Sequence, residues 1–351
     1  MLLVGLIGGG IWLLGAVMGV ARRRRAVLLG LLLGVVLLIQ LTLPAGNALR
    51  VATGGSAAPW LLLLGLGGLA ALYAALLGVL RGRVRQENKP PQEPQTQPGR
   101  FAPGEIERYA RHIVLREIGG GGQKALKNAR VLVIGAGGLG APALLYLAAA
   151  GVGRIGVVDD DVVEGANLQR QVIHTDARIG MPKVFSAQIA MQAINPWADI
   201  RPYNRRFVKA DAALFEDYDL VLEGSDNFET RYLVNRTAAR LGVPLVSGAL
   251  SQWEGQVALF DPARGGPCYQ CVFPEAPAPH LAPSCAEAGV LSPLPGIIGS
   301  MMAAEAIKRI TGAGADLTGR MMIHDALYAE ARVITLKRRA DCPVCGGHAA
   351  P

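Results

Sequence analysis

The chain has 351 residues, more than one ordinary domain requires, and its charge is distributed unevenly. Residues 1–85 contain eight of the 35 basic residues and none of the 27 acids, so the net charge of +8 belongs to this first quarter and residues 86–351 are neutral. A basic enzyme that binds nucleic acid is therefore excluded, because such a protein carries its excess charge on the folded domain. A content of 51% hydrophobic residues excludes intrinsic disorder of the whole chain.

The first quarter is typical of a membrane anchor. Residues 2–20, 26–43 and 60–80 are apolar runs without an acid or a base. As helices they reach roughly 27–32 Å, which matches a hydrocarbon core of about 30 Å. A cleaved signal peptide is disfavoured for the first run, since four arginines follow it and no basic residue precedes it. The sequence therefore predicts three transmembrane helices within residues 1–85.

The arginines predict the orientation of this anchor. Four of them separate the first two runs and three follow the third run, whereas the loop 44–59 has one. The positive-inside rule places both clusters in the cytoplasm. We therefore expect a multi-pass protein of the cell's inner membrane, with everything after Arg85 in the cytoplasm.

A proline-rich spacer, residues 86–104, separates the anchor from the rest of the chain. It contains five prolines and almost no large apolar side chains, which is typical of a solvated, partly extended linker. Residues 105–351 then suit one large domain. We expect a form that starts near Gln86 to be soluble and active.

Strand and helix patterns alternate along this domain. Such alternation predicts a parallel sheet with right-handed crossovers, and the fold class is α/β and Rossmann-like, with a mixed but mostly parallel sheet. The expected helices are 105–117, 141–150, 183–194, 228–241 and 289–311, and the expected strands are 130–134, 155–158, 220–222, 245–246, 256–260, 321–324 and 332–336.

A glycine-rich loop joins the first strand to the next helix. Gly135, Gly137, Gly138 and Gly140 fit the pattern G-x-G-x-x-G, which lets phosphate approach the backbone at a helix N-terminus. Asp159, at the end of the second strand, is placed to accept hydrogen bonds from ribose hydroxyls. These residues alone indicate nucleotide binding and favour a nicotinamide-dependent dehydrogenase.

Further charged residues change that interpretation. Arg170 lies just beyond the acidic end of the second strand, Lys183 begins the next helix, and Asp226 follows strand 220–222. Hydride transfer needs no such set. Phosphate chemistry does, because two cations neutralise developing charge and one carboxylate binds Mg²⁺.

Two CxxC pairs are the second strong signal. Four thiolates in two such pairs are typical of a tetrahedral Zn²⁺ site that has no open position and is therefore structural. A disulfide pairing is disfavoured in the reducing cytoplasm, and a redox-active CxxC is the alternative. The expected ligands are Cys268, Cys271, Cys342 and Cys345.

The order of these motifs resembles the MoeB/ThiF/HesA family of ubiquitin-activating-enzyme-like adenylyltransferases. The resemblance covers residues 105–346 but not the apolar runs, and it is carried by RYARH (108–112), GAGGLG (135–140), NLQRQ (167–171), Pro182-Lys183, SDN (225–227), EGQV (254–257) and both CxxC pairs. It implies ATP-dependent adenylylation of the C-terminal glycine of a small ubiquitin-like sulfur-carrier protein, with release of pyrophosphate.

The resemblance also implies roles for single residues. Gly138 contacts the nucleotide and Asp159 holds its ribose. Asp226 coordinates Mg²⁺, with Asn227 beside it, and Arg111 reaches the ATP site of a second subunit in a homodimer. The phosphates are contacted by Asn167, Arg170 and Lys183.

Cys285 is the one cysteine that belongs to neither CxxC pair. In related enzymes a cysteine at this position forms a thioester or acyl-disulfide with the carrier, and an ordinary cysteine is the alternative. Sulfur is expected from a separate donor protein. The sequence also leaves open an activating enzyme for a peptide or other non-sulfur carrier, and a membrane-tethered adaptor with a vestigial site.

Overall fold

The computed structural model describes residues 2–87, 100–277 and 288–346. The chain divides into two compact units, Met1–Pro90 and Pro91–Pro351, which are described separately. Most of the expected linker and Cys285 lie outside the described residues.

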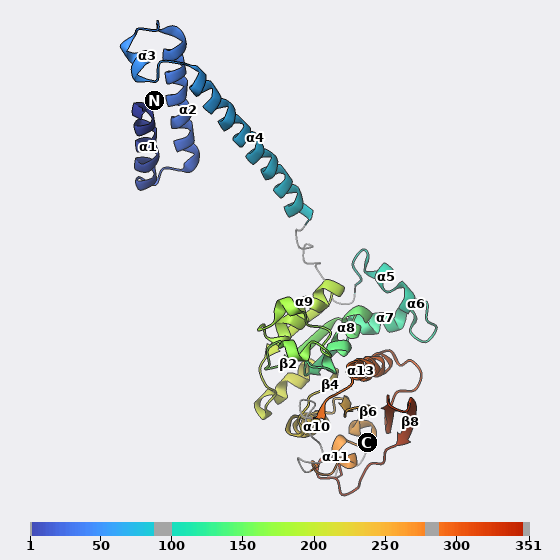
Figure 1. Ribbon diagram of the computed structural model, residues 1–351. Helices are drawn as coiled ribbons and strands as arrows, with labels where there is room; N and C mark the ends of the chain where they lie inside the picture. The colour runs from blue at the N-terminus through green and yellow to red at the C-terminus, as the bar shows by residue number, and fades with distance from the viewer. Residues whose placement is uncertain (1, 88–99, 278–287, 347–351) are drawn as a thin grey trace. The chain divides into compact units, whose positions relative to one another are not determined.

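The first unit is helical (Figure 1). It comprises α1 (Leu2–Val17), α2 (Arg22–Thr42), α3 (Ala48–Ala52) and α4 (Ala58–Glu87). A small apolar cluster of Val4, Val36, Leu37 and Trp60 joins α1, α2 and α4. The amide nitrogen of the buried Gln40 is held by the α2–α4 connection, because it donates to the carbonyl of Arg50 at 2.9 Å and to Thr53 Oγ1 at 2.8 Å.

Two helices of this unit are long and apolar enough to cross a membrane, over Arg24–Thr42 in α2 and Ala58–Leu77 in α4. This finding concerns length and composition, and a signal sequence or the core helix of a soluble protein has the same character. The first expected span is different, because α1 has 16 residues and reaches only about 24 Å. Three spanning helices are therefore not what the structure shows.

The second unit is built on one eight-stranded sheet in the order β3-β2-β1-β4-β5-β6-β7-β8. All four pairs among the first five strands in this order are parallel, and the last three pairs are antiparallel, which confirms the mixed, mostly parallel sheet. The strands are β1 (Arg130–Ile134), β2 (Arg154–Asp159), β3 (Asp199–Asn204), β4 (Leu220–Glu223), β5 (Leu245–Leu250), β6 (Glu254–Phe260), β7 (Arg320–Asp325) and β8 (Glu330–Thr335).

Helices cover both faces of the sheet because the side chains of each strand alternate between them. Val131 and Val133 of β1 pack against one group of helices, whereas Leu132 and Ile134 pack against a second group on the other face. The first group is α7 (Gly119–Asn128), α8 (Gly140–Ala150), α9 (Lys183–Ile194) and α13 (Leu294–Thr311), and the second is η3 (Lys209–Asp217), α10 (Phe228–Leu241) and α11 (Tyr269–Val272). The three-layered arrangement is visible in Figure 1.

Several elements differ from the sequence expectation. The helix expected over 105–117 is two short helices, α5 (Glu105–Arg108) and α6 (Ala110–Ile113), and α13 begins at Leu294. The helix α7 was not predicted, because four consecutive glycines at its start disfavour a helix. The strand β3 was also missed, since it contains Pro202 and polar residues that only an edge strand tolerates.

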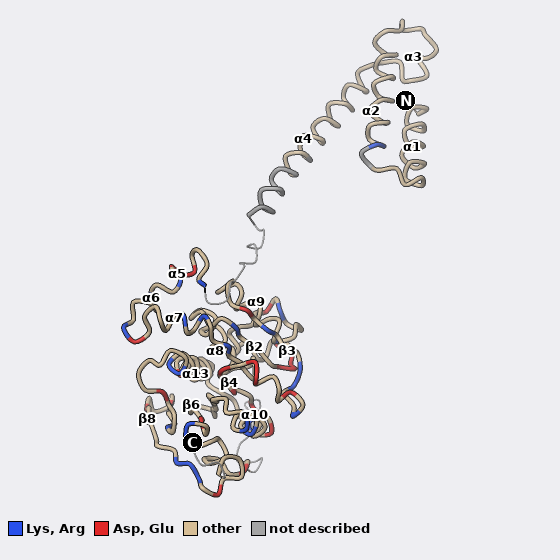
Figure 2. The backbone as a smooth tube through the Cα atoms, turned by 180° about the vertical axis from the view of Figure 1, so that it is seen from behind, with Lys and Arg blue, Asp and Glu red and all other residues tan. Residues whose placement is uncertain are grey.

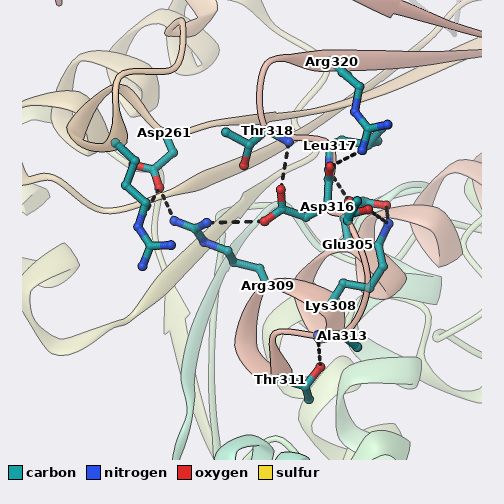
Figure 3. A network of polar contacts seen from close by, with 12 residues as sticks. Asp261, Glu305, Lys308, Arg309, Thr311, Ala313, Asp316, Leu317, Thr318 and Arg320 are labelled. Atoms are coloured by element: carbon teal, nitrogen blue, oxygen red, sulfur yellow. Dashed lines mark hydrogen bonds and ion pairs between the residues drawn. The ribbon is translucent and has the colours of Figure 1, made fainter. Parts of the chain in front are cut away.

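A polar network fixes the C-terminal end of α13 to the sheet (Figure 3). Arg309 pairs with Asp261, at the end of β6, and with Asp316 at 3.3 Å. Glu305 accepts from the backbone N–H of Leu317 at 2.8 Å and pairs with Lys308. A depression of about 400 Å³ adjoins this network, between the end of α13 and the beginning of β7. Because its charged groups bond to one another, we assign the network to the stability of the fold.

Ala329 is a strained residue in the β7–β8 hairpin, with a φ of 57°. We expect Ala329→Gly to raise the free energy of unfolding by about 0.5–1 kcal/mol, since a side chain disfavours this backbone conformation. Thermal unfolding of the purified protein measures it. Ala331→Gly is the control, because it places glycine in the regular strand β8 and should destabilise by a similar amount. Equal effects of the two variants would contradict the expectation.

Candidate active site

The site expected from the sequence lies at the carboxyl edge of the parallel strands. The glycine loop follows β1, Asp159 ends β2, and Asp226 follows β4. The strand order changes direction between β1 and β4, which is where ligands bind in open α/β sheets. In Figure 2, basic and acidic positions are interspersed over this second unit, in keeping with its balanced charge.

Close contacts require glycine at several points of the loop. Gly135 has a φ of 98°, and a Cβ on Gly140 would lie 1.9 Å from the carbonyl oxygen of Gly135. A Cβ on Gly138 would lie 3.1 Å from Pro295, at the start of α13. The backbone can therefore turn sharply here and leave room for phosphate, as the sequence predicts.

Asp159, at the end of β2, is hydrogen-bonded to the glycine loop. Its carboxylate accepts from the backbone N–H of Ala136 at 2.7 Å and from that of Asp161 at 2.9 Å. Burial raises the pKa of Asp159, and these hydrogen bonds together with Lys183 oppose the rise. One carboxylate oxygen of Asp159 thus bonds to the glycine loop. The contact of Asp159 with ribose stays a prediction.

His174 was missed by sequence reasoning. It is buried under the loop, with Nε2 at 2.9 Å from the carbonyl oxygen of Ala136 and Nδ1 at 2.9 Å from Ser186 Oγ. The segment around it has neither helical nor strand periodicity, so no sequence signal indicates this contact across 38 positions.

Burial lowers the pKa of His174 from 6.5, and the charges of Lys183 and Arg178 lower it further, against the opposing Ala136 hydrogen bond. As the pH falls, the unfolded chain therefore takes up the imidazole proton before the folded chain does. The contribution of neutral His174 to the free energy of unfolding is complete above about pH 6.5 and is lost as the pH falls from there through the folded pKa. We expect the unfolding free energy of wild type to fall more steeply than that of His174→Gln between pH 7 and 5, by up to about 1.4 kcal/mol per pH unit. Parallel profiles in chemical unfolding would contradict this.

Arg170 lies beside the glycine loop and is oriented by Asn167. Its guanidinium donates to Asn167 Oδ1 at 2.9 Å, and Asn167 donates to Glu164 at 3.1 Å. The Cγ of Arg170 is 3.8 Å from the position of a Cβ on Gly138. The structure thus brings Arg170 and Asn167 together at the loop.

Lys183 is buried at the start of α9. Its ammonium donates to Asp161 Oδ2 at 2.7 Å. Three neighbouring carboxylates, Asp159, Asp160 and Asp161, lie within 4.8 Å of one another, but each already has a hydrogen-bond or ion-pair partner. We therefore assign no metal to them.

The loop after β4 carries Asp226 into the site and is held by buried groups. The carboxylate of Glu223 accepts from the Ser225 backbone N–H at 2.7 Å and from Ser247 Oγ at 3.1 Å. Arg231 donates to the carbonyl of Ser225 at 2.6 Å. Asp226 itself is exposed. This arrangement leaves its carboxylate open to solvent on a fixed backbone.

Asn227 and Arg111 are also predicted to contact the nucleotide, and these contacts stay predictions. Asn227 caps α10, since its Oδ1 accepts from the backbone N–H of Thr230 at 2.9 Å. This contact gives it a structural role. Arg111 is exposed on α6, and its predicted reach into a second subunit stays a prediction.

The four cysteines of the two CxxC pairs converge, as predicted. All are buried and free, and their Sγ atoms lie within 4.8 Å of one another, with 3.6 Å between Cys268 and Cys342 and 3.4 Å between Cys271 and Cys345. A tetrahedral site with Zn–S bonds of about 2.3 Å requires S–S separations of about 3.8 Å. The cluster therefore fits a structural zinc.

The four cysteines can all be thiolates only with a cation at their centre. Burial raises the pKa of Cys268 and brings that of Cys345 to about 11. In Cys342, burial is outweighed by the backbone N–H groups of Cys345 and Val344, and the pKa falls to about 7. Four buried thiolates are unstable without a positive charge at their centre.

Comparison with known proteins places this site in a family. The ThiF family profile matches residues 109–344. The sulfur carrier protein adenylyltransferase of Thermus thermophilus is 50% identical over 252 residues, which cover 70% of this chain and 93% of that protein. The SAMP-activating enzyme E1 of Haloferax volcanii is 46% identical over 243 residues, which cover 69% and 89% of the two chains. The crystal structure of E. coli MccB with MccA-N7isoASN shares the fold, with a TM-score of 0.61 at 20% identity over 73% of this chain and 77% of that one.

The sheet and the glycine loop define a nucleotide-binding fold, and the matched relatives identify a nucleotide-dependent transferase rather than a dehydrogenase. The chain belongs to the ThiF family, and it is an ATP-dependent adenylyltransferase.

Proposed function

We propose that this enzyme uses ATP to adenylylate the C-terminal glycine of a small sulfur-carrier protein and releases pyrophosphate. The observation that carries the proposal is the 50% identity to an adenylyltransferase of a sulfur carrier protein, over a match that covers 93% of that protein. The carboxylate of the carrier attacks the α-phosphorus, the bond from that phosphorus to the bridging oxygen breaks, and pyrophosphate leaves.

The chain needs no catalytic base for this step, because the attacking carboxylate is already ionised near neutral pH. It needs to position ATP and to neutralise the leaving pyrophosphate. Backbone N–H groups of the glycine loop and the side chains of Arg170 and Lys183 supply these functions in the proposal. Asp226 would hold Mg²⁺, which stabilises charge on the phosphates when bound.

Carrier-dependent exchange between ATP and labelled pyrophosphate tests the proposal in the detergent-solubilised full chain. We expect exchange with a sulfur-carrier protein that ends in Gly-Gly and none with the same carrier after deletion of its last glycine. Exchange with short peptides, and with none of the carrier proteins, would establish the alternative of a peptide-activating enzyme.

We further propose that residues 1–87 tether the enzyme to the inner membrane through α2 and α4, with the catalytic unit in the cytoplasm. Only 11% and 6% of the two apolar windows are buried, which disfavours core helices of a soluble protein. An even number of spans keeps both arginine clusters on one side, so the expected orientation does not depend on α1.

Protease accessibility tests this topology. Protease added to intact cells should spare the catalytic unit, and protease added to inside-out vesicles should release it. Recovery of the protein in the soluble fraction, or cleavage in intact cells, would overturn the proposal. The homodimer, the trans role of Arg111, the separate sulfur donor and covalent chemistry at Cys285 stay predictions.

A further inference from the structure

Three side chains form a chain of hydrogen bonds that ends on the glycine loop. Arg178 Nη1 donates to Ser186 Oγ at 3.3 Å and to the Ser186 carbonyl at 2.7 Å. Ser186 Oγ lies 2.9 Å from His174 Nδ1, and His174 Nε2 lies 2.9 Å from the carbonyl oxygen of Ala136. His174 and Ser186 are buried, so water does not compete for these bonds.

The direction of each bond follows from its end groups. A carbonyl oxygen only accepts, so the proton of neutral His174 is on Nε2 and donates to Ala136. Nδ1 then accepts from the hydroxyl of Ser186, and the oxygen of that hydroxyl accepts from Arg178, which has only donors. The chain fixes both the tautomer and the orientation of the imidazole.

The carbonyl of Ala136 belongs to the same peptide group as the N–H of Gly137. In a trans peptide these two groups point in opposite directions, and the described chain has no cis peptide bond. Holding the carbonyl toward His174 therefore points the N–H of Gly137 outward. The preceding peptide is fixed as well, because its N–H, on Ala136, donates to Asp159.

Gly137 stands where a phosphate can approach. A Cβ there would meet only Gln171 Nε2, at 3.6 Å, and among the described residues no acceptor takes its N–H. We infer that His174 is a positioning residue that directs the N–H of Gly137 at the phosphates of bound ATP. The inference rests on the proposed function only in taking ATP as the ligand.

Two conservative variants of the full chain separate this role from a general structural one. In His174→Gln the side-chain amide reaches the position of Nε2 and keeps the bond to Ala136. In His174→Asn the amide reaches only the position of Nδ1, so the bond to Ser186 is kept and the bond to Ala136 is lost. Equilibrium binding of ATP and of adenosine, without any carrier, is the readout.

We expect His174→Asn to weaken ATP binding about tenfold, the loss of one buried hydrogen bond, and to leave adenosine binding unchanged. His174→Gln should bind ATP within about threefold of wild type. Equal losses in both variants, parallel losses for ATP and adenosine, or wild-type ATP binding by His174→Asn would overturn the inference. If the wild-type protein bound ATP but did not catalyse pyrophosphate exchange with any of the carriers tested, the proposed function would be refuted and this inference would still stand.

Discussion

Asp226→Asn should lower carrier-dependent pyrophosphate exchange by about 100- to 1000-fold and leave the fold intact. The expected loss corresponds to removal of one preorganised electrostatic group at a reacting phosphate. The fold should survive because the side chain of Asp226 is exposed, whereas the loop backbone is held by Glu223 and Arg231. Thermal unfolding should therefore change by less than about 0.5 kcal/mol.

Glu229→Gln is the matched control for this variant. Glu229 is also an exposed acid, in the first turn of α10 and three positions from Asp226. The substitution Glu229→Gln removes one negative charge from the same region without changing the loop after β4. Near wild-type exchange by Asp226→Asn, or an equal loss in both variants, would show that Asp226 has no specific role in the adenylylation step.

The parts of the site that the sequence predicts are those encoded by local pattern. The glycine spacing after an apolar run determines both the turn and its place at the end of β1. The CxxC spacing determines that two ligands lie close together, so the cysteine cluster is predictable although its halves are 74 positions apart in the chain.

The parts that escape sequence reasoning depend on contacts between distant segments. His174 has meaning only because β1 and α9 bring Ala136 and Ser186 to its two ring nitrogens. Asn227 shows that a polar residue in a ligand-binding motif can also cap the helix that follows, a contact that the sequence motif does not indicate. In both cases the position in the fold, rather than the residue type, decides the role.

The four-cysteine cluster should hold one Zn²⁺ per chain, and Cys342→Ser should remove the metal and destabilise the second unit. Cys342 lies in the C-terminal segment, 3.6 Å from Cys268, which follows β6. Without Cys342 only three thiolates remain, which is fewer than a closed tetrahedral zinc site needs. Because metal binding and folding are coupled at structural zinc sites, we expect a loss of several kcal/mol of unfolding free energy. Elemental analysis of protein purified without chelator and thermal unfolding measure the two effects.

Cys285→Ser is the control, since Cys285 is the one cysteine of the sequence outside the two CxxC pairs. It should keep the zinc and the wild-type unfolding temperature, whatever its effect on later transfer of the carrier. A structural metal also predicts that activity and fold disappear together when a chelator removes zinc, because no ligand position is open to substrate. If zinc-free protein kept its fold and still exchanged pyrophosphate, the cluster would not be a structural metal site. If Cys342→Ser kept one zinc per chain, the proposed ligand set would be wrong.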